Sequence, residues 1–358
     1  MKNTLTVGAA LLLTTSAAFA GGIDRSGQSI GAIFEEGSYA ELSYGSVTPS
    51  ITGSIAGGSI ESNNIAPSYG QLGLAYKRDV NDRFSVALII DQPFGADVAY
   101  GGTTYPLAGT SAEVNATSTT AVGRYKFNDN VSVHFGPRYL AADGNYTAVI
   151  GGTTLYTSTY EQGTGSGYVA GVAYERKDIA LRVALTYSSE IDLELEGSGA
   201  GGLGDLNATM PESWNLDFQS GVAADTLVFG SIRHVGWSEA VIRDAALGDL
   251  ISYDQDTTSY TLGVGRKFSD SFSGALSVGY EEEQGGTASN LAPTDGNMSI
   301  GIGGTYTIDN GIALTGGIRY VMTGDASSNV PISATATTPS DFSDNSAIAI
   351  GLKVAYSF

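Results

Sequence analysis

Apolar and polar residues alternate along most of the chain, most clearly from Ile179 to Leu195. Eight of the nine odd positions in this segment are apolar or aromatic, whereas the even positions carry small, polar or charged side chains such as Arg182 and Glu190. A period of two places successive side chains on opposite faces of a β-strand. As one strand the segment would be roughly 50 Å long or more, far beyond the strands of ordinary globular proteins.

The same alternation recurs in fourteen segments bounded by turn residues, so the chain is predicted to be all-β. The predicted strands are 38–48, 65–78, 83–95, 112–127, 131–143, 160–175, 179–195, 206–222, 226–239, 256–268, 272–283, 296–308, 311–323 and 345–358. Six of the connections between them are short turns, and they alternate with seven long ones. The long connections are 49–64, 96–111, 144–159, 196–205, 240–255, 284–295 and 324–344.

This alternation of short and long connections is typical of a bacterial outer-membrane barrel, with tight periplasmic turns and longer outer loops. Closure would remove exposed strand edges, and a tilted membrane-spanning strand needs about 9–11 residues. Aromatic residues beside the short turns, including Tyr76 and Phe268, fit an interfacial girdle. The pattern therefore predicts a 14-stranded antiparallel transmembrane β-barrel over 38–358, although periodicity does not say which face points outward.

The first 20 residues have the pattern of a secretory signal peptide. A basic start precedes an apolar run over 7–13, and residues 18–20 (Ala-Phe-Ala) form a cleavage site of small residues. The run is shorter than a membrane helix requires, and no stretch of 18 apolar residues follows it. We therefore expect export to the outer membrane and a short plug-like luminal segment over 21–37.

Composition argues against several other classes. The 358 residues include no cysteine and only two histidines, which excludes disulfide scaffolds and leaves little for a zinc site. The net charge of −20 argues against nucleic acid as a partner, because phosphate binding requires clustered Lys and Arg. A glycine pattern at 199–204 matches the dinucleotide motif by letter only, since no helix follows it, and no Gly-x-Ser-x-Gly occurs. We expect no enzyme activity, no cofactor and no metal.

Four stretches of the chain resemble the FadL/TodX family of outer-membrane transporters for long-chain fatty acids and other hydrophobic compounds. They are Phe84–Gly95 (FSVALIIDQPFG), Tyr187–Gly197 (YSSEIDLELEG), Met210–Phe218 (MPESWNLDF) and Val354–Phe358 (VAYSF), in order on the predicted strands. The similarity runs from about Ala66 to the C-terminus, and fourteen strands are that family's number. It implies that a hydrophobic ligand lands on the outer loops, enters the lumen and leaves sideways into the membrane at a kink in the third strand.

The third predicted strand contains its own reason for a break, in the sequence Asp91-Gln92-Pro93-Phe94-Gly95. Proline has no N–H for the β-ladder and is excluded from central strands, and every strand of a closed barrel is central. Gly95 permits a bulge two residues later. The segment is therefore a candidate lateral opening. The alternative is that Pro93 merely ends the strand before the following loop.

Two departures from the family pattern limit what the resemblance implies. Members usually begin with a longer hatch that includes an Asn-Pro-Ala motif, whereas this chain offers only 21–37 and lacks the motif. The basic residue that receives the fatty-acid carboxylate has no match in strand five, which has Ala141-Ala142-Asp143 in the corresponding region. The identity of the plug and of the carboxylate partner both stay open.

Strand parity places three arginines, Arg138, Arg182 and Arg319, on the luminal face. A lipid-facing arginine at the bilayer midplane would cost about 2–4 kcal/mol. Each of the three is a candidate partner for a ligand carboxylate. In the alternative, they pair with luminal acids such as Glu190 or Asp217 and stiffen the wall.

The long loops carry apolar patches that are candidates for ligand capture. They comprise Val149, Ile150, Leu155 and Tyr156 in one loop, Leu203 and Leu206 in the next, and Val241, Ile242, Leu247, Leu250 and Ile251 in a third. The spacing in the third patch is compatible with a short helix. In the alternative interpretation the patches pack on one another and cap the barrel.

The leading hypothesis is passive uptake of hydrophobic molecules, long-chain fatty acids above all, across the outer membrane. Its other expected partners are outer-membrane lipid and the barrel-assembly machinery, because Phe358 and Tyr356 resemble the C-terminal signal of chains that this machinery inserts. Two alternatives stay open. One is a diffusion porin for small polar solutes, which the excess of acids would make cation-selective, and the other is a non-transporting adhesin or phage receptor.

Overall fold

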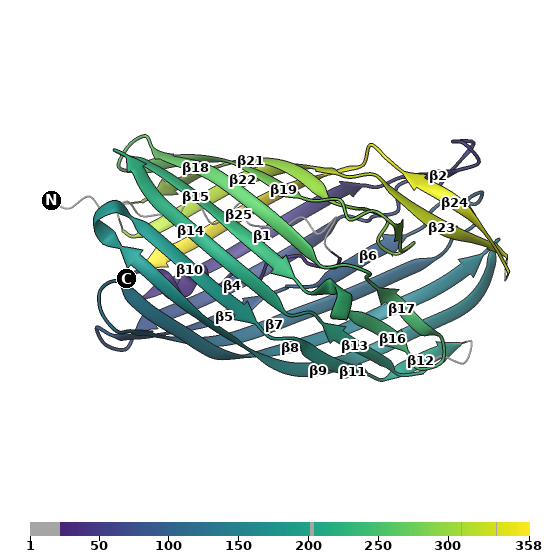
Figure 1. Ribbon diagram of the computed structural model, residues 1–358, viewed down its shortest axis with the longest axis horizontal. Helices are drawn as coiled ribbons and strands as arrows, with labels where there is room; N and C mark the ends of the chain where they lie inside the picture. Colours follow the sequence, from purple (N-terminus) through teal and green to yellow (C-terminus); the bar gives the residue numbers. More distant parts are fainter. Residues whose placement is uncertain (1–21, 201–203, 309, 334) are drawn as a thin grey trace.

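The computed structural model describes residues 22–200, 204–308, 310–333 and 335–358. It is a closed antiparallel barrel of fourteen strands (Figure 1), which confirms the predicted fold class. The strands of the wall, in order, are β1 (Tyr39–Ser50), β4 (Tyr69–Asp79), β5 (Phe84–Asp91) continued by β6 (Gly95–Ala99), β7 (Ser111–Lys126), β8 (Val131–Ile150), β9 (Thr153–Arg176), β10 (Leu181–Ser188), β14 (Ser213–Ala223), β15 (Thr226–Val235), β18 (Thr257–Lys267), β19 (Phe272–Glu281), β21 (Asn297–Thr307), β22 (Ile312–Thr323) and β25 (Ser346–Ser357). β25 pairs with β1, which closes the wall.

The apolar face of the strands points away from the lumen. In β25 the side chains of Ile350 and Leu352 are 52% and 60% exposed, whereas the neighbouring Ala349 and Lys353 are 4% and 7% exposed. A continuous exposed apolar band of this kind is stable against hydrocarbon rather than water. Apolar side chains therefore face lipid, and the small or polar ones face the lumen.

The C-terminus lies at the end of the barrel that carries the short turns (Figure 1). The backbone N–H of Phe358 donates to the carbonyl of Ser38 at 2.9 Å, which joins the last strand to the start of the first. Exposed Tyr76 and Phe268 lie beside these turns, at the level of the expected girdle. Within the described ranges, helical structure is limited to short 3-10 turns, η2 (Gly31–Phe34), η3 (Lys177–Ile179) and η4 (Trp237–Glu239). In the part of the chain described, no helix has the length and apolar character needed to cross a membrane.

Two small sheets lie at the opposite end of the barrel, which we call the mouth (Figure 1). One contains β11 (Ile191–Leu195), β13 (Leu206–Met210), β16 (Val241–Asp244) and β17 (Gly248–Ser252). The other contains β2 (Gly53–Ile55), β3 (Ile60–Glu61), β20 (Thr287–Ala288), β23 (Ala326–Ser333) and β24 (Ala336–Phe342), while β12 (Gly197–Ala200) pairs with β9. Much of the sequence expected as loop is therefore extended structure.

Two loop segments differ from what their sequence suggests. The patch over 241–251, whose spacing is compatible with a short helix, is instead the β16–β17 hairpin, in which Ile242 lies opposite Ile251. The loop expected over 144–159 is the tip of the long β8–β9 hairpin, which turns at Gly151 and Gly152 with positive φ. In both segments cross-strand pairing prevails over the spacing of apolar residues.

The strand expected over 179–195 is also wrong as a single element. β10 ends at Ser188, and β11 bends out of the wall to lie against the inner face of β9. Gly163 and Gly165 of β9 permit this contact, because a Cβ on either would lie 2.2 Å from a carbonyl oxygen of β11. The apolar face that meets lipid in β10 is consequently buried inside the barrel at Leu193, which is 2% exposed.

Candidate functional site

Strand 3 of the wall, formed by β5 and β6, is interrupted around Pro93. β5 ends at Asp91 and β6 begins at Gly95. β6 pairs with β7, but among the described residues β5 and β6 pair with β4 only as far as Leu74↔Ile90. The wall therefore has a gap between β6 and the mouth-side half of β4, and a residue without an N–H lies at its centre.

The side chain of Gln92 fills part of this gap. Its Oε1 accepts a hydrogen bond from the backbone N–H of Leu72 at 2.8 Å, and the Gln71 amide donates to the Gln92 carbonyl at 3.4 Å. A side chain thus replaces ladder bonds that strand 3 does not make. The wall is closed here by rotatable side chains rather than by a continuous strand.

The N-terminal segment forms backbone hydrogen bonds with the interrupted strand on its luminal side. The N–H of Arg25 donates to the carbonyl of Pro93 at 2.7 Å, and the N–H of Gly95 donates to the carbonyl of Ile23 at 2.9 Å. The segment pairs with the break as a short antiparallel bridge. Backbone groups at the break therefore have partners although β4 does not provide them.

Polar side chains fix the same segment to three different wall strands. The pairs are Asp24 with Arg233 of β15 at 2.6 Å, Ser26 with Asp91 of β5 at 2.5 Å, and Gln28 with Arg138 of β8 at 2.8 Å. Hydrogen bonds to charged groups are stronger than those between neutral groups. The segment is thus held across the lumen at the level of the break.

The turn η2 closes the lumen on the side of the short turns. Ile33 is fully buried, and the ring of Phe34 lies 4.7 Å from the guanidinium carbon of Arg124 and 4.8 Å from that of Arg182. Burial raises the pKa of the following residue, Glu35, although nearby basic groups act in the opposite direction. These few residues pack against the luminal faces of several wall strands.

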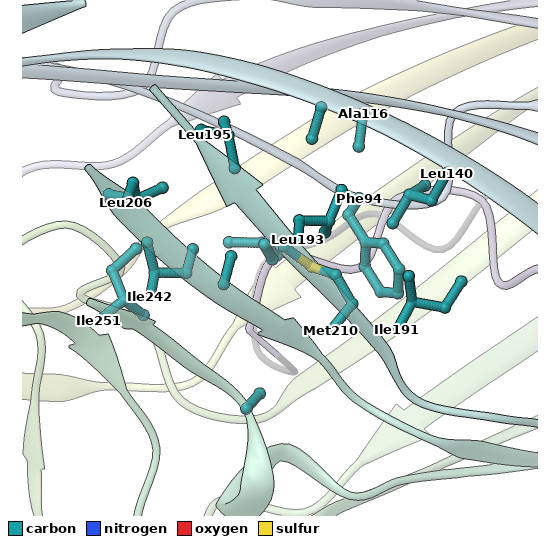
Figure 2. Packing of buried hydrophobic residues seen from close by; sticks show 14 of the residues in the cluster. Phe94, Ala116, Leu140, Ile191, Leu193, Leu195, Leu206, Met210, Ile242 and Ile251 are labelled. Atoms are coloured by element: carbon teal, nitrogen blue, oxygen red, sulfur yellow. The ribbon is translucent and has the colours of Figure 1, made fainter. Parts of the chain in front are cut away.

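An apolar core closes the other end of the lumen. Figure 2 shows Ile191 of β11 and Met210 of β13 close to Phe94 of the break. Phe94 is 2% exposed, and its ring packs edge-on against Trp237 with centroids 6.3 Å apart. The residue that follows Pro93 therefore connects the break to the core of the mouth.

Two pockets adjoin the gap. The first, of about 150 Å³, is lined by Ser26 and Asp91, which face the lumen, and also by Leu72 and Leu352, whose side chains are exposed on the outer face. Its lining therefore includes residues from both faces of the wall. The second, of about 70 Å³, lies on the mouth side between the N-terminal segment, β6 and the start of β4.

The three arginines expected in the lumen occupy three different settings. Arg138 donates to Gln28, Arg182 lies over Phe34, and Arg319 is 7% exposed in a polar pocket that Glu281 also lines. Of the acids suggested as partners, Asp217 is a diagonal neighbour of Arg182 on the β10–β14 ladder. Glu190 is exposed in the bend after β10.

The loop residues expected to capture ligand do not form one surface. Val149 and Leu206 are buried, Ile150 and Tyr156 are half-buried, Leu155 is exposed on β9, and Leu203 lies outside the described residues. Leu206 belongs to the mouth core together with Ile242 and Ile251. These positions support the interpretation in which apolar loop residues cap the barrel.

Sequence reasoning missed the polar residues of the N-terminal segment. Asp24, Arg25, Ser26 and Gln28 all contact the break or the luminal wall. One signal was present, since four polar side chains within five residues are not required merely to lead into a strand. Across the described ranges, no group of three or more His, Asp or Glu residues is placed to hold a metal ion.

An outward-facing apolar surface, an N-terminal segment inside the lumen and an interrupted third strand define this molecule as a membrane transport barrel. A family model described as "Outer membrane protein transport protein (OMPP1/FadL/TodX)" matches residues 36–358, and the chain belongs to this family. The resemblance noted in the sequence is confirmed, and the protein is a transport protein of the outer membrane rather than an enzyme.

Individual relatives are distant in sequence. A protein of Salmonella typhi named "Long-chain fatty acid transport protein" is 20% identical over 317 residues, which cover 73% of this chain and 72% of the relative. The crystal structure of a Pseudomonas aeruginosa FadL homologue has a TM-score of 0.74 and 13% identity, with 91% of each chain covered. That of the P. putida toluene transporter TodX has a TM-score of 0.69 and 14% identity, with 92% of each chain covered. The two structures share the fold of this chain.

Proposed function

We propose that this protein takes up hydrophobic molecules, long-chain fatty acids above all, by passive diffusion, and that they leave sideways through the gap between β4 and β6. The observation that carries the proposal is the pocket at the break. Its lining includes luminal Ser26 and Asp91 as well as lipid-facing Leu72 and Leu352. A ligand that passes there moves from the lumen directly into hydrocarbon.

A sideways exit is favoured by the solubility of the ligand. Each methylene transferred from an apolar environment to water costs about 0.8 kcal/mol, so a chain of about sixteen methylenes would lose roughly 13 kcal/mol in an aqueous exit. The straight route along the barrel axis is also obstructed by η2 and by the buried side chains of Ile33 and Phe34. The lateral gap avoids both obstacles.

The names of two relatives indicate two candidate classes of ligand. One relative is named for long-chain fatty acids and another for toluene. In this chain the lumen beside the break contains the guanidinium groups of Arg25, Arg138 and Arg233. A fatty-acid carboxylate offers these groups an acceptor, whereas toluene has none, so their presence supports the acid as ligand.

The proposal also covers how the protein reaches the membrane. We expect export by a signal peptide over 1–20, with 21–37 as the luminal plug of the mature barrel. Insertion by the barrel-assembly machinery would use Tyr356 and Phe358, whose rings are exposed and stacked with centroids 5.1 Å apart. Outer-membrane lipid would then surround the apolar face of the wall.

The test replaces Pro93-Phe94-Gly95 with Val-Thr-Val to restore a regular strand. We expect uptake of radiolabelled oleate to fall to the level of host cells that lack the protein, while unheated gel electrophoresis still shows a folded barrel. A Cβ at Gly95 would lie 2.5 Å from the Arg25 guanidinium, so a second variant changes only Pro93 and Phe94.

Pro331→Val is a matched control, because Pro331 lies in a strand of the mouth away from the break. Its uptake should equal that of the unaltered protein. Unchanged uptake in both folded break variants would reject the lateral route. Failure of the unaltered protein to take up oleate would reject the ligand class.

A further inference from the structure

Arg25 lies at the junction of the N-terminal segment and the break. The residue is 5% exposed and lines the mouth-side pocket together with Ile65, Tyr69 and Val98. Its guanidinium lies over the Tyr69 ring, 4.0 Å from the centroid. The charged group is therefore held in a fixed place inside an otherwise largely apolar recess.

The hydrogen-bonding capacity of Arg25 is only partly used. Its Nη2 donates to Asp97 Oδ2 at 2.6 Å, whereas its buried Nε has no acceptor among the described residues. Nε and Nη2 form one edge of the guanidinium, and a carboxylate binds such an edge best with both of its oxygens. Asp97 accepts a hydrogen bond from Nη2, which leaves Nε as a buried donor without an acceptor in the described part of the chain. Such a donor destabilises the folded state because it has lost its hydrogen bonds to water.

The surroundings of Arg25 suit an anion that carries an apolar chain. Ile23, Ile51, Ile65 and Leu291 line the same pocket and offer contacts to methylene groups. The pocket opens beside the gap between β4 and β6, where Gly95 leaves the space that the guanidinium occupies. The competing anion, Asp97, is itself 22% exposed and therefore able to be solvated when it is displaced.

We propose that Arg25 binds the anionic headgroup of the ligand, with the ligand carboxylate accepting from Nε and competing with Asp97 for Nη2. The assignment rests on the proposed uptake function and adds its headgroup specificity. It places the acid-recognising residue on the N-terminal segment rather than on a wall strand. The apolar tail lies against the mouth-side pocket and the adjoining gap.

The experiment compares two probes that differ in charge. Binding of oleate and of the neutral oleyl alcohol is measured by equilibrium dialysis with the purified full-length protein in a non-ionic detergent. For Arg25→Gln we expect at least tenfold weaker binding of oleate and less than a twofold change for oleyl alcohol. Arg25→Lys should recover part of the oleate affinity, and Asp97→Asn should strengthen oleate binding about threefold or more.

Arg176→Gln serves as the control, because Arg176 is exposed at the end of β9 and is paired with Asp178. It should leave both affinities unchanged. Equal losses for both probes in Arg25→Gln would show a merely structural role and overturn the assignment, as would no loss for either. In those cases the uptake function would survive, whereas failure of the unaltered protein to bind either probe would overturn both.

Discussion

Two interruptions of the wall, in strand 3 (β5 and β6) and in strand 7 (β10), differ in cause and in outcome. In strand 3 the chain breaks at its own Pro93, and the strand then resumes within the wall as β6. In strand 7 no proline is present, and the chain after Ser188 turns inside the barrel as β11. The first interruption adjoins two pockets, whereas the second is filled by the apolar core of the mouth.

The difference shows that the course of a strand depends on the residues of its neighbour as well as on its own residues. β11 lies inside because Gly163 and Gly165 of β9 present no side chain to it. Strand 3 instead resumes in the wall as β6, and backbone groups at its break are paired by the N-terminal segment. The contrast supports the proposed exit at strand 3, whereas the chain after strand 7 contributes to the apolar core of the mouth.

The largest expected effect comes from adding a side chain to β9 where β11 lies against it. In Gly165→Val the Cβ would lie 2.2 Å from the Asp192 carbonyl and 2.5 Å from a methyl of Ile191, so β11 must move and the mouth core must open. Planar-bilayer recording should change from nearly silent to steady conductance. Gly101→Val, where a Cβ meets nothing within 4 Å, is the control and should stay silent. Steady conductance in the unaltered protein would instead favour a diffusion porin.

Truncation of the residue that joins the two regions should have the next largest effect. Phe94→Ala removes a buried ring from its contact with Trp237, and such truncations cost about 3 kcal/mol or more. Urea titration of the barrel in lipid vesicles should show this loss in the free energy of unfolding. Phe268→Ala, at an exposed girdle position, should lose clearly less. Equal losses would mean that the break and the mouth are not coupled through Phe94.

A smaller effect is expected from the side chain that fills the gap. Gln92→Ala removes the acceptor of the Leu72 N–H, a contact worth about 1 kcal/mol, so the gap should open more readily. Initial rates of oleate uptake should rise about fivefold, which is the rate equivalent of that energy. Gln219→Ala removes a similar side-chain bond, to the Ala180 carbonyl, away from the break. A rise in both variants, or in neither, would contradict a specific role for Gln92.

The smallest expected effect concerns the ion pair between Glu36, near the end of the N-terminal segment, and Lys177. A hydrogen bond from Lys177 lowers the pKa of Glu36, and both side chains are largely exposed. A carboxyl with a lowered folded-state pKa stabilises the protein above its unfolded value of about 4.3, and this contribution is lost as pH falls through the folded-state pKa. Exposed pairs contribute about 0–1 kcal/mol.

Glu36→Gln should therefore lower Tm slightly at pH 7, and the difference from the unaltered protein should vanish near pH 3. Thermal unfolding followed by circular dichroism across this range provides the measurement. A difference that grows towards low pH would have the wrong sign. Because the pair lies away from both interruptions, uptake of oleate should not change.

The wall could be predicted because period two continues through every membrane-spanning segment. The structure begins strands at Phe84, Val131 and Thr226, at or next to the positions expected from the sequence. Predictions were wrong where strands leave the wall or extend beyond the membrane, as at 144–159 and 179–195. In those segments the alternation continues, but the face that meets lipid in the rest of the wall meets protein or water.

The candidate site was only partly visible in the sequence. Pro93 marks the break because proline lacks a ladder donor, and that property is local. The hydrogen bond between Arg25 and Asp97, separated by 72 positions, is a contact that no local pattern encodes. Arg138 and Arg182 were placed in the lumen by parity, but their partners Gln28 and Phe34 come from the N-terminal segment.

By itself the sequence determined an all-β membrane barrel, its strand number and the weak point in strand 3, since these follow from side-chain period and from the chemistry of single residues. Only the tertiary structure decided that apolar side chains face outward, that β11 lies inside, and that residues 22–36 close the break and the lumen. Those outcomes depend on which surfaces meet, and the meeting partners are distant in the chain.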